Sequence, residues 1–282
     1  MRKSFTMIEL ILVIVISGII GTAGSLAMVQ IMQNYVIQKE YNKLELDSSA
    51  AIRQIKKYLQ DSIWDSIAIK VNNNYTSIFN INSANTGNIQ RNTELVFIEK
   101  NIDSINGNFG VLQANFYNIP IFSGLVDLNI SNKKTIISRS DMDRLSNLRP
   151  YVNRIALYFP YANVGGSIYD RFYNTNEARR TSLFTITRIL TEVTMELLNI
   201  PKMMGDIALI ANTKPTILRK DNNDNLILVD GATNQSQVLL QNVSSVKIWS
   251  EAATNLIRIR VCFKNKIMDF MPEFCKEGVA LQ

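Results

Sequence analysis

The chain has 282 residues, of which 46% are hydrophobic and 19% are charged. This composition is typical of a folded protein and excludes a disordered one. The sequence contains no histidine, which excludes histidine-ligated zinc sites and nucleophiles that depend on a histidine base. Arg2 and Lys3 supply two of the six net positive charges, and the mild excess that remains argues only weakly for acidic partners or nucleic acid.

An uncharged apolar run covers residues 10–29, directly after a short basic N-terminus. A helix of this length, rising about 1.5 Å per residue, spans the roughly 30 Å hydrocarbon core of a bilayer. Arg2 and Lys3 in front of the run predict a cytoplasmic N-terminus and an exported remainder. Because no A-x-A-like cleavage site follows the run, we expect it to stay attached as a membrane anchor.

Glu9 lies at the boundary between the basic N-terminus and the apolar run. A carboxylate among lipid-facing residues is costly, so its presence predicts a functional role with a specific partner. The alternative is that Glu9 lies at the headgroup level of a plain signal anchor.

The N-terminus resembles that of type IV prepilins and type II secretion pseudopilins, which carry G-F-T-L-I-E where this chain has SFTMIE at residues 4–9. The resemblance implies that a membrane-embedded aspartyl peptidase cuts between Ser4 and Phe5 and methylates the new N-terminus. Ser4 stands where the family usually has glycine. It also implies that Glu9 pairs with the terminal amine of a neighbouring subunit during assembly.

The same resemblance implies a pilin-like α+β fold, in which a long N-terminal helix packs on a mainly antiparallel β-sheet head. Residues 1–4 are then a leader peptide and residues 5–64 the helix, with a transmembrane half at about 10–29. Residues 65–282 are an extracytoplasmic, β-rich head in the periplasm, anchored by a single pass in a bacterial inner membrane.

The function implied is that of a minor pilin or pseudopilin, a structural subunit that primes or caps a type IV pilus-like filament in a type II secretion, pilus or DNA-uptake system. Its partners would be other subunits, the prepilin peptidase, the inner-membrane assembly platform and the bilayer. A mass of 32.0 kDa is large for a major subunit of this family and favours a place at the filament tip. The alternative is a membrane-anchored binding protein or adhesin that uses a pilin-type export signal. No pair of acidic residues can be placed in one pocket from the sequence, so we expect no enzyme activity.

Apolar residues at helical spacing continue beyond the bilayer span, with charged residues between them. They are Met28, Ile31, Met32, Tyr35, Leu44, Ile52, Ile55 and Leu59. Neither proline nor glycine interrupts residues 26–64, which favours one long helix whose apolar stripe faces the head.

Residues 72–92 are rich in Asn, Ser, Thr and Gly, and this composition predicts a loop that connects the helix to a sheet. Short segments with strand character follow at 94–99, 154–160, 183–190, 216–219, 226–230, 246–249 and 257–263. In the last of these, apolar and polar residues alternate, which is typical of an antiparallel strand with one buried face. Residues 239–246 loosely resemble the corresponding region of J-type pseudopilins and W-type minor pilins.

Cys262 and Cys275 are the two cysteines of the chain. In an oxidising, exported compartment an even count favours a disulfide, the alternative being two separately buried thiols. A metal site is not expected, because no second pair of ligands exists. Pilins also carry a C-terminal bridge of this kind.

Residues 221–225 form a short oxygen-rich segment in which Asp221 and Asp224 are candidate calcium ligands. The segment lies between two predicted strands, where Asn and Asp also serve as hairpin-turn residues. No glycine lies in it and no bidentate glutamate follows at EF-hand distance, so the turn is favoured and no cofactor is expected.

Two basic places could contact nucleic acid, namely 179–180 and the face formed by Arg258 and Arg260. The alternative is a solvated strand edge protected by charge. No repeated aromatic and basic pattern accompanies these residues, so we expect no direct binding of nucleic acid.

Overall fold

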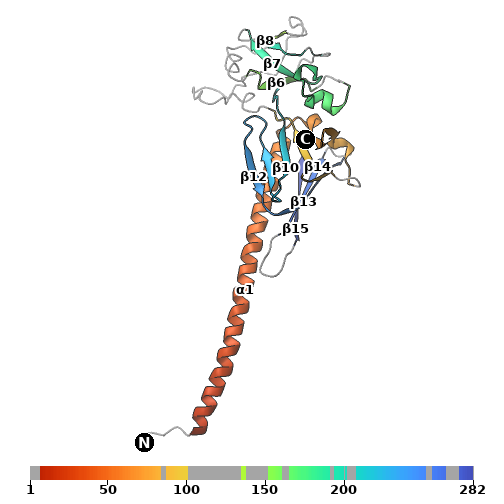
Figure 1. The fold of residues 1–282 in the computed structure, drawn as a ribbon. Coiled ribbons are helices and arrows are strands. Elements are labelled where there is room, and N and C mark those ends of the chain that lie inside the picture. Colours follow the sequence, from red (N-terminus) through yellow and green to blue (C-terminus); the bar gives the residue numbers. More distant parts are fainter. Residues whose placement is uncertain are drawn as a thin grey trace.

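The computed structural model describes residues 7–83, 87–100, 152–160, 165–190, 194–199, 201, 208–251, 256–264 and 273–281, and the backbone of 135–137. A single long helix, α1, extends from a head built of antiparallel strands (Figure 1). The predicted α+β class is therefore confirmed. Ser4 and Phe5 lie outside the described residues.

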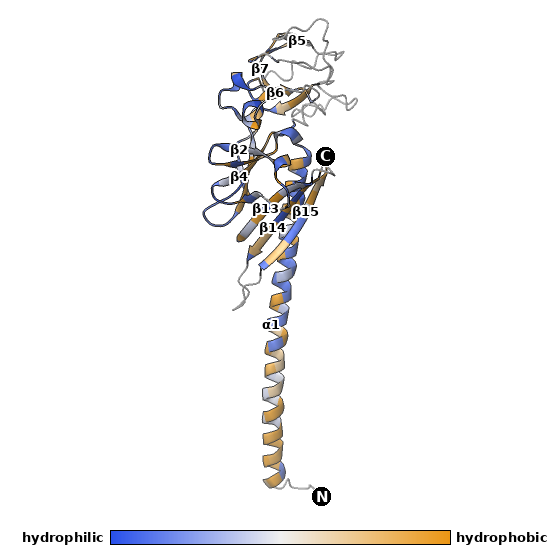
Figure 2. Cartoon of the chain, turned by 90° about the vertical axis from the view of Figure 1, so that its right-hand side faces the viewer, coloured by the Kyte–Doolittle hydropathy of each residue, from blue (hydrophilic) through white to orange (hydrophobic). Residues whose placement is uncertain are grey.

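The helix α1 covers Met7–Gln60, and only its second half is covered by the head. Its buried residues are Ser48, Ala51, Ile52, Ile55 and Leu59. The prediction that the whole apolar stripe faces the head is therefore wrong for its first four members, because Met28, Ile31, Met32 and Tyr35 are exposed. Figure 2 shows this part of the helix as an uncovered and largely hydrophobic shaft.

The helix ends at Gln60, four residues before the predicted end at residue 64. The sequence holds no glycine or proline there, and the end comes from tertiary pairing. Ile63 N–H donates to the Ile98 carbonyl oxygen at 2.8 Å, and Ser62 forms an isolated β-bridge with Glu99. The chain therefore leaves the helix to join a strand, and a short 3-10 helix, η1 (Trp64–Ser66), follows.

Two sheets pack against one face of the second half of α1. The larger has the strand order β12-β11-β10-β4-β1-β2, and the smaller has the order β15-β14-β13-β3. The strands of the larger sheet are β1 Ala68–Val71, β2 Asn74–Ser77, β4 Thr93–Phe97, β10 Thr216–Lys220, β11 Leu226–Val229 and β12 Ser236–Leu240. Those of the smaller sheet are β3 Gly87–Ile89, β13 Val243–Glu251, β14 Leu256–Lys264 and β15 Glu273–Leu281. Every pairing in both sheets is antiparallel.

One hydrophobic core joins these two sheets to the helix. In β14 the predicted burial of Ile257, Ile259, Val261 and Phe263 is confirmed, whereas Cys262, which the alternation places on the solvent face, is also buried. The prediction that residues 72–92 form a loop is wrong, because they contain β2, a 3-10 helix η2 (Ile78–Asn80) and β3. The polar residues of β2 suit an edge strand, which pairs on one side only with β1.

A third sheet, the distal sheet, lies at the end of the head farthest from the N-terminus of α1 (Figure 1). Its order is β5-β8-β7-β6-β9, with bounds β5 Thr135–Ile137, β6 Ile155–Tyr158, β7 Leu183–Ile189, β8 Thr194–Leu197 and β9 Leu209–Asn212. Ile155 and Leu157 of β6 lie in one hydrophobic cluster, on one face of the sheet. Ala156 and Tyr158 lie in a second hydrophobic cluster, on the other face, so β6 is buried on both faces. The second cluster includes Ile63, Val96 and Ile98, and it joins the distal sheet to the rest of the head.

Polar contacts reinforce that junction. A π-helical segment, η4 (Tyr169–Tyr173), and a 3-10 turn, η5 (Glu177–Arg179), lie between β6 and β7. Asp65 accepts hydrogen bonds from the Tyr158 hydroxyl at 2.9 Å and from Arg171 at 3.2 Å. The Tyr173 hydroxyl donates to the Ser66 carbonyl oxygen. The distal sheet is thus docked through both apolar and polar contacts.

Gly278 of β15 lies directly against α1. A Cβ atom at this position would lie 2.3 Å from Cγ2 of Ile52, and a β-branched side chain in a helix has little freedom to rotate away. We expect Gly278→Ala to lower the free energy of unfolding by about 2 kcal/mol, measured by thermal or denaturant unfolding. Gly165→Ala is the control, because nothing lies within 4 Å of the added Cβ. Equal stability of the two variants would contradict this packing.

Candidate functional site

The start of α1 is the first candidate site, because it combines one acid with a long apolar surface. Glu9 lies in the first turn of the helix and is exposed. A negative charge is favoured at that end by the helix dipole. Within the described residues α1 is the one helix long and apolar enough to cross a membrane, and none of its most apolar window is buried in the head.

The exposed, uncharged segment of α1 is longer than the hydrocarbon core of a bilayer is thick. Exposed large hydrophobic residues run along the helix at Met7, Ile8, Leu10, Ile11, Leu12, Val13, Ile14, Val15, Ile16, Ile19, Ile20, Leu26, Met28, Val29, Ile31, Met32, Tyr35 and Val36. No Asp, Glu, Lys or Arg occurs in residues 10–38. At 1.5 Å per residue this segment is about 43 Å long, whereas the hydrocarbon core is about 30 Å thick. Beyond the apolar run of residues 10–29, the rest of the segment carries exposed apolar side chains, such as Ile31 and Met32, together with the amides of Gln30 and Gln33.

The disulfide predicted from the two cysteines is present. Cys262 of β14 and Cys275 of β15 face each other in register, with their Cα atoms 4.0 Å apart. The bond joins the edge strand of the smaller sheet to its neighbour, and the same edge strand carries Gly278 against α1. It therefore fastens the part of the sheet that holds the helix.

The candidate calcium residues lie in the turn between β10 and β11. The Asp221 carboxylate accepts hydrogen bonds from the backbone N–H groups of Asn223 and Asn225, each at 2.8 Å. The bond from Asn225 is the main cause that lowers the pKa of Asp221. Asp224 has a left-handed backbone with φ of 60° and pairs with Lys220 at 3.1 Å. Both acids are thus engaged as hairpin-turn residues, and among the described residues no three His, Cys, Asp or Glu side chains are arranged so that they could hold a metal ion.

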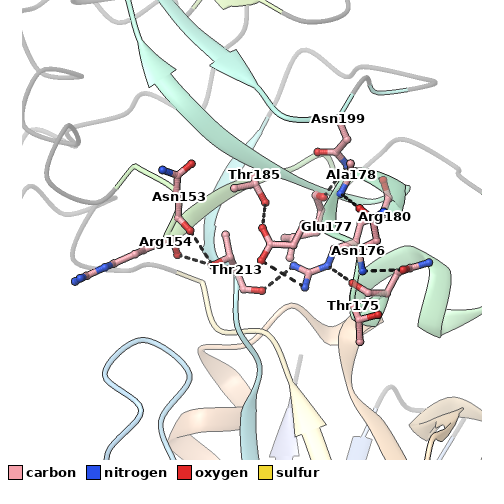
Figure 3. Close-up of polar contacts among 12 residues, drawn as sticks. Asn153, Arg154, Thr175, Asn176, Glu177, Ala178, Arg180, Thr185, Asn199 and Thr213 are labelled. Carbon is pink, nitrogen blue, oxygen red and sulfur yellow. Dashed lines mark hydrogen bonds and ion pairs between the residues drawn. The ribbon is translucent and has the colours of Figure 1, made fainter.

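The basic pair at 179–180 does not form a continuous surface, because Arg180 is buried (Figure 3). Its guanidinium donates to the Asn174 carbonyl at 3.1 Å and to the Thr213 carbonyl at 2.8 Å. It also lies 3.9 Å from Glu177, whose carboxylate accepts from Thr185. Arg180 therefore links the segment before β7 to the turn between β9 and β10, which is a structural role.

The second basic place is neutralised by acids on neighbouring strands. Arg258 and Arg260 both contact Glu277 of β15, at 3.0 Å and 2.9 Å, and Arg258 also pairs with Glu251. Hydrogen bonds from Arg260 and Arg258 hold the pKa of Glu277 below its usual range. These pairs suit a charged sheet face rather than a phosphate-binding groove.

One polar cavity of about 520 Å³ has no counterpart in the sequence predictions. It is lined by Gln54, Lys57, Tyr58, Asp61, Glu99, Lys100, Asn212, Asp230, Ala232 and Thr233. These residues come from four separate parts of the chain, and no motif connects them. Burial raises the pKa of Glu99 to about 7, and the charges of Asp230 and Asp61 act in the same direction.

In comparisons with known proteins, no family model matches the chain, and no curated protein or solved structure is significantly similar to it.

Proposed function

We propose that the protein is a minor pilin or pseudopilin, a subunit that primes or caps a type IV pilus-like filament. One observation carries this proposal: α1 begins with a single acid, Glu9, and continues as uncharged, exposed helix for about 43 Å. A simple anchor needs only the length that crosses the bilayer. Partner helices would cover the apolar surface that remains above it, while Glu9 would pair with the terminal amine of a neighbouring subunit.

Processing and export belong to the same proposal. A prepilin peptidase would cut between Ser4 and Phe5 and methylate Phe5, as the N-terminal motif indicates. The head would fold in the periplasm, where the bond between Cys262 and Cys275 is stable. An inner-membrane assembly platform would then move the helix from the lipid into the filament. We assign the protein no reaction.

The shape of the head supports a position of this subunit at the filament tip. The distal sheet extends the molecule beyond the two sheets that hold α1, away from the helix N-terminus (Figure 1). A subunit in the shaft must accept other subunits above it, and such an extension would obstruct them. At the tip it would remain uncovered and could meet cargo or a substrate.

Photo-cross-linking in cells tests this arrangement. A photoreactive phenylalanine analogue at Ile31, whose side chain is 68% exposed on α1, is expected to link to other filament subunits. The same analogue at Leu190, at the end of β7, is expected to link to none of them if the distal sheet lies at the tip. Only lipid adducts at Ile31 would contradict the filament proposal and favour an anchored binding protein or adhesin. Subunit adducts at Leu190 would contradict the tip position alone.

A further inference from the structure

Residues 98–100, here called the seam, join two parts of the molecule through their backbone. On one side, Lys100 N–H donates to the Asp61 carbonyl, just beyond α1, at 2.8 Å. On the other side, Asn212 N–H donates to the Glu99 carbonyl at 3.0 Å, and Lys100 forms a bridge with Ala211 of β9. The seam therefore connects the end of the helix to the distal sheet.

The side chain of Glu99 is fixed at the seam by a directed chain of hydrogen bonds. Gly231 N–H donates to the Thr216 hydroxyl oxygen at 2.9 Å. Because that hydroxyl has one proton, it donates this proton to Glu99 Oε1. Glu99 also lines the polar cavity.

The charged and titratable groups around Glu99 come from every element that surrounds the cavity. The helix side supplies Lys57, Tyr58 and Asp61, the seam itself supplies Lys100, and the turn between β11 and β12 supplies Asp230. β9 and β10 supply the uncharged Asn212 and Thr216. Ionised Glu99 therefore adds a third carboxylate to a partly buried cavity that already contains two.

We propose that the seam is a proton-sensitive joint, in which protonated Glu99 holds the distal sheet against the end of α1 and ionised Glu99 loosens it. The geometry gives the mechanism. Ionisation places a charge in a desolvated position, near the acids Asp61 and Asp230, on the segment that carries the backbone bonds to both sides. This inference goes beyond the proposed filament function and does not depend on it.

The direction of the pH effect follows from proton linkage. Burial raises the pKa of Glu99 from 4.5 to about 7, so the closed seam binds a proton more tightly than an opened seam in which the carboxyl is solvated. The closed seam therefore loses stability as the pH rises from about 4.5 towards 7, and the loss levels off above 7. Between pH 5 and pH 8 the opening equilibrium is expected to increase on the order of 70-fold.

Hydrogen exchange on the full-length protein in detergent micelles tests this joint. Protection of the Lys100 and Asn212 amides, corrected for intrinsic exchange rates, is expected to fall on the order of 70-fold between pH 5 and pH 8. In the Glu99→Gln variant, which mimics the protonated form, these two amides are expected to have the same protection at pH 5 and at pH 8. Identical pH dependence in the wild type and in this variant would overturn the proposal.

Two further variants keep the test decisive. Glu45→Gln, on α1 and far from the cavity lining, is expected to leave the wild-type pH dependence unchanged. Asp230→Asn keeps the side-chain oxygen that accepts from Ala232 N–H but removes a negative neighbour of Glu99. It is therefore expected to lower the midpoint of the transition. An unchanged midpoint would overturn the joint even if Glu99→Gln failed to fold.

Discussion

Replacing Glu9 by alanine is expected to abolish incorporation of the protein into filaments while membrane insertion and head folding remain intact. In the proposed assembly the Glu9 carboxylate neutralises the terminal amine of a neighbouring subunit in an apolar environment. Removing one partner of such a pair leaves the other charge without compensation, at a cost of at least about 3 kcal/mol. Subunit association should therefore weaken on the order of 100-fold. Filament fractions from sheared cells, compared with membrane fractions, measure the effect.

The matched control is Glu40→Ala, which makes the same chemical change on the same helix beyond its uncharged segment. It is expected to assemble as the wild type does. Head folding is followed separately, through the disulfide and thermal unfolding. Normal incorporation of the Glu9→Ala protein would contradict the filament assignment, because a plain signal anchor does not need this carboxylate.

Removing the disulfide is expected to produce the second large effect. The bond closes a loop with a sequence separation of 13 residues, and a loop of this size stabilises the folded state by about 3 kcal/mol. For a head of this size the double change Cys262→Ser and Cys275→Ser should lower the melting temperature by about 6–12 °C. Amide hydrogen exchange in the variant should increase most in β15, because β15 is an edge strand that pairs only with β14.

Reduction of the wild-type protein provides the internal control. A thiol reductant should lower the wild-type melting temperature towards that of the double variant and should leave the variant unchanged. If the oxidised wild type and the variant melt at the same temperature, the disulfide does not fasten β15.

The elements that the sequence predicted well are those whose pattern is local. The long helix follows from an apolar run and from the absence of proline and glycine in residues 26–64, and β14 follows from the alternation at residues 257–263. The disulfide could be predicted because only one pairing of two cysteines exists. All seven predicted strand segments overlap strands of the structure.

The features that the sequence could not predict depend on distant partners. The helix ends at Gln60 because residues 62 and 63 pair with the seam, and no residue type there marks an end. β2 is a polar edge strand whose composition resembles that of a loop. β15 was missed because Gly278 and its charged neighbours hide the period-two pattern.

Candidate sites marked by a local sequence pattern could also be predicted, whereas those formed by distant residues could not. Glu9 could be placed on the first turn of a helix from its position alone. Arg180 could not be distinguished from a surface arginine, because its carbonyl partners at Asn174 and Thr213 come together only in the fold. No sequence pattern marks Glu99 as a buried acid in a cavity. The acids beside it, Asp61 and Asp230, lie 38 and 131 positions away in the chain.

The central claim is that the chain is processed and assembled as a filament subunit. Intact-mass and N-terminal analysis of the membrane-extracted protein, with and without its prepilin peptidase, tests it most directly. The account predicts a chain that starts at a methylated Phe5 only when the peptidase is present. A chain that retains residues 1–4 in both cases would contradict the account and would identify α1 as a plain membrane anchor.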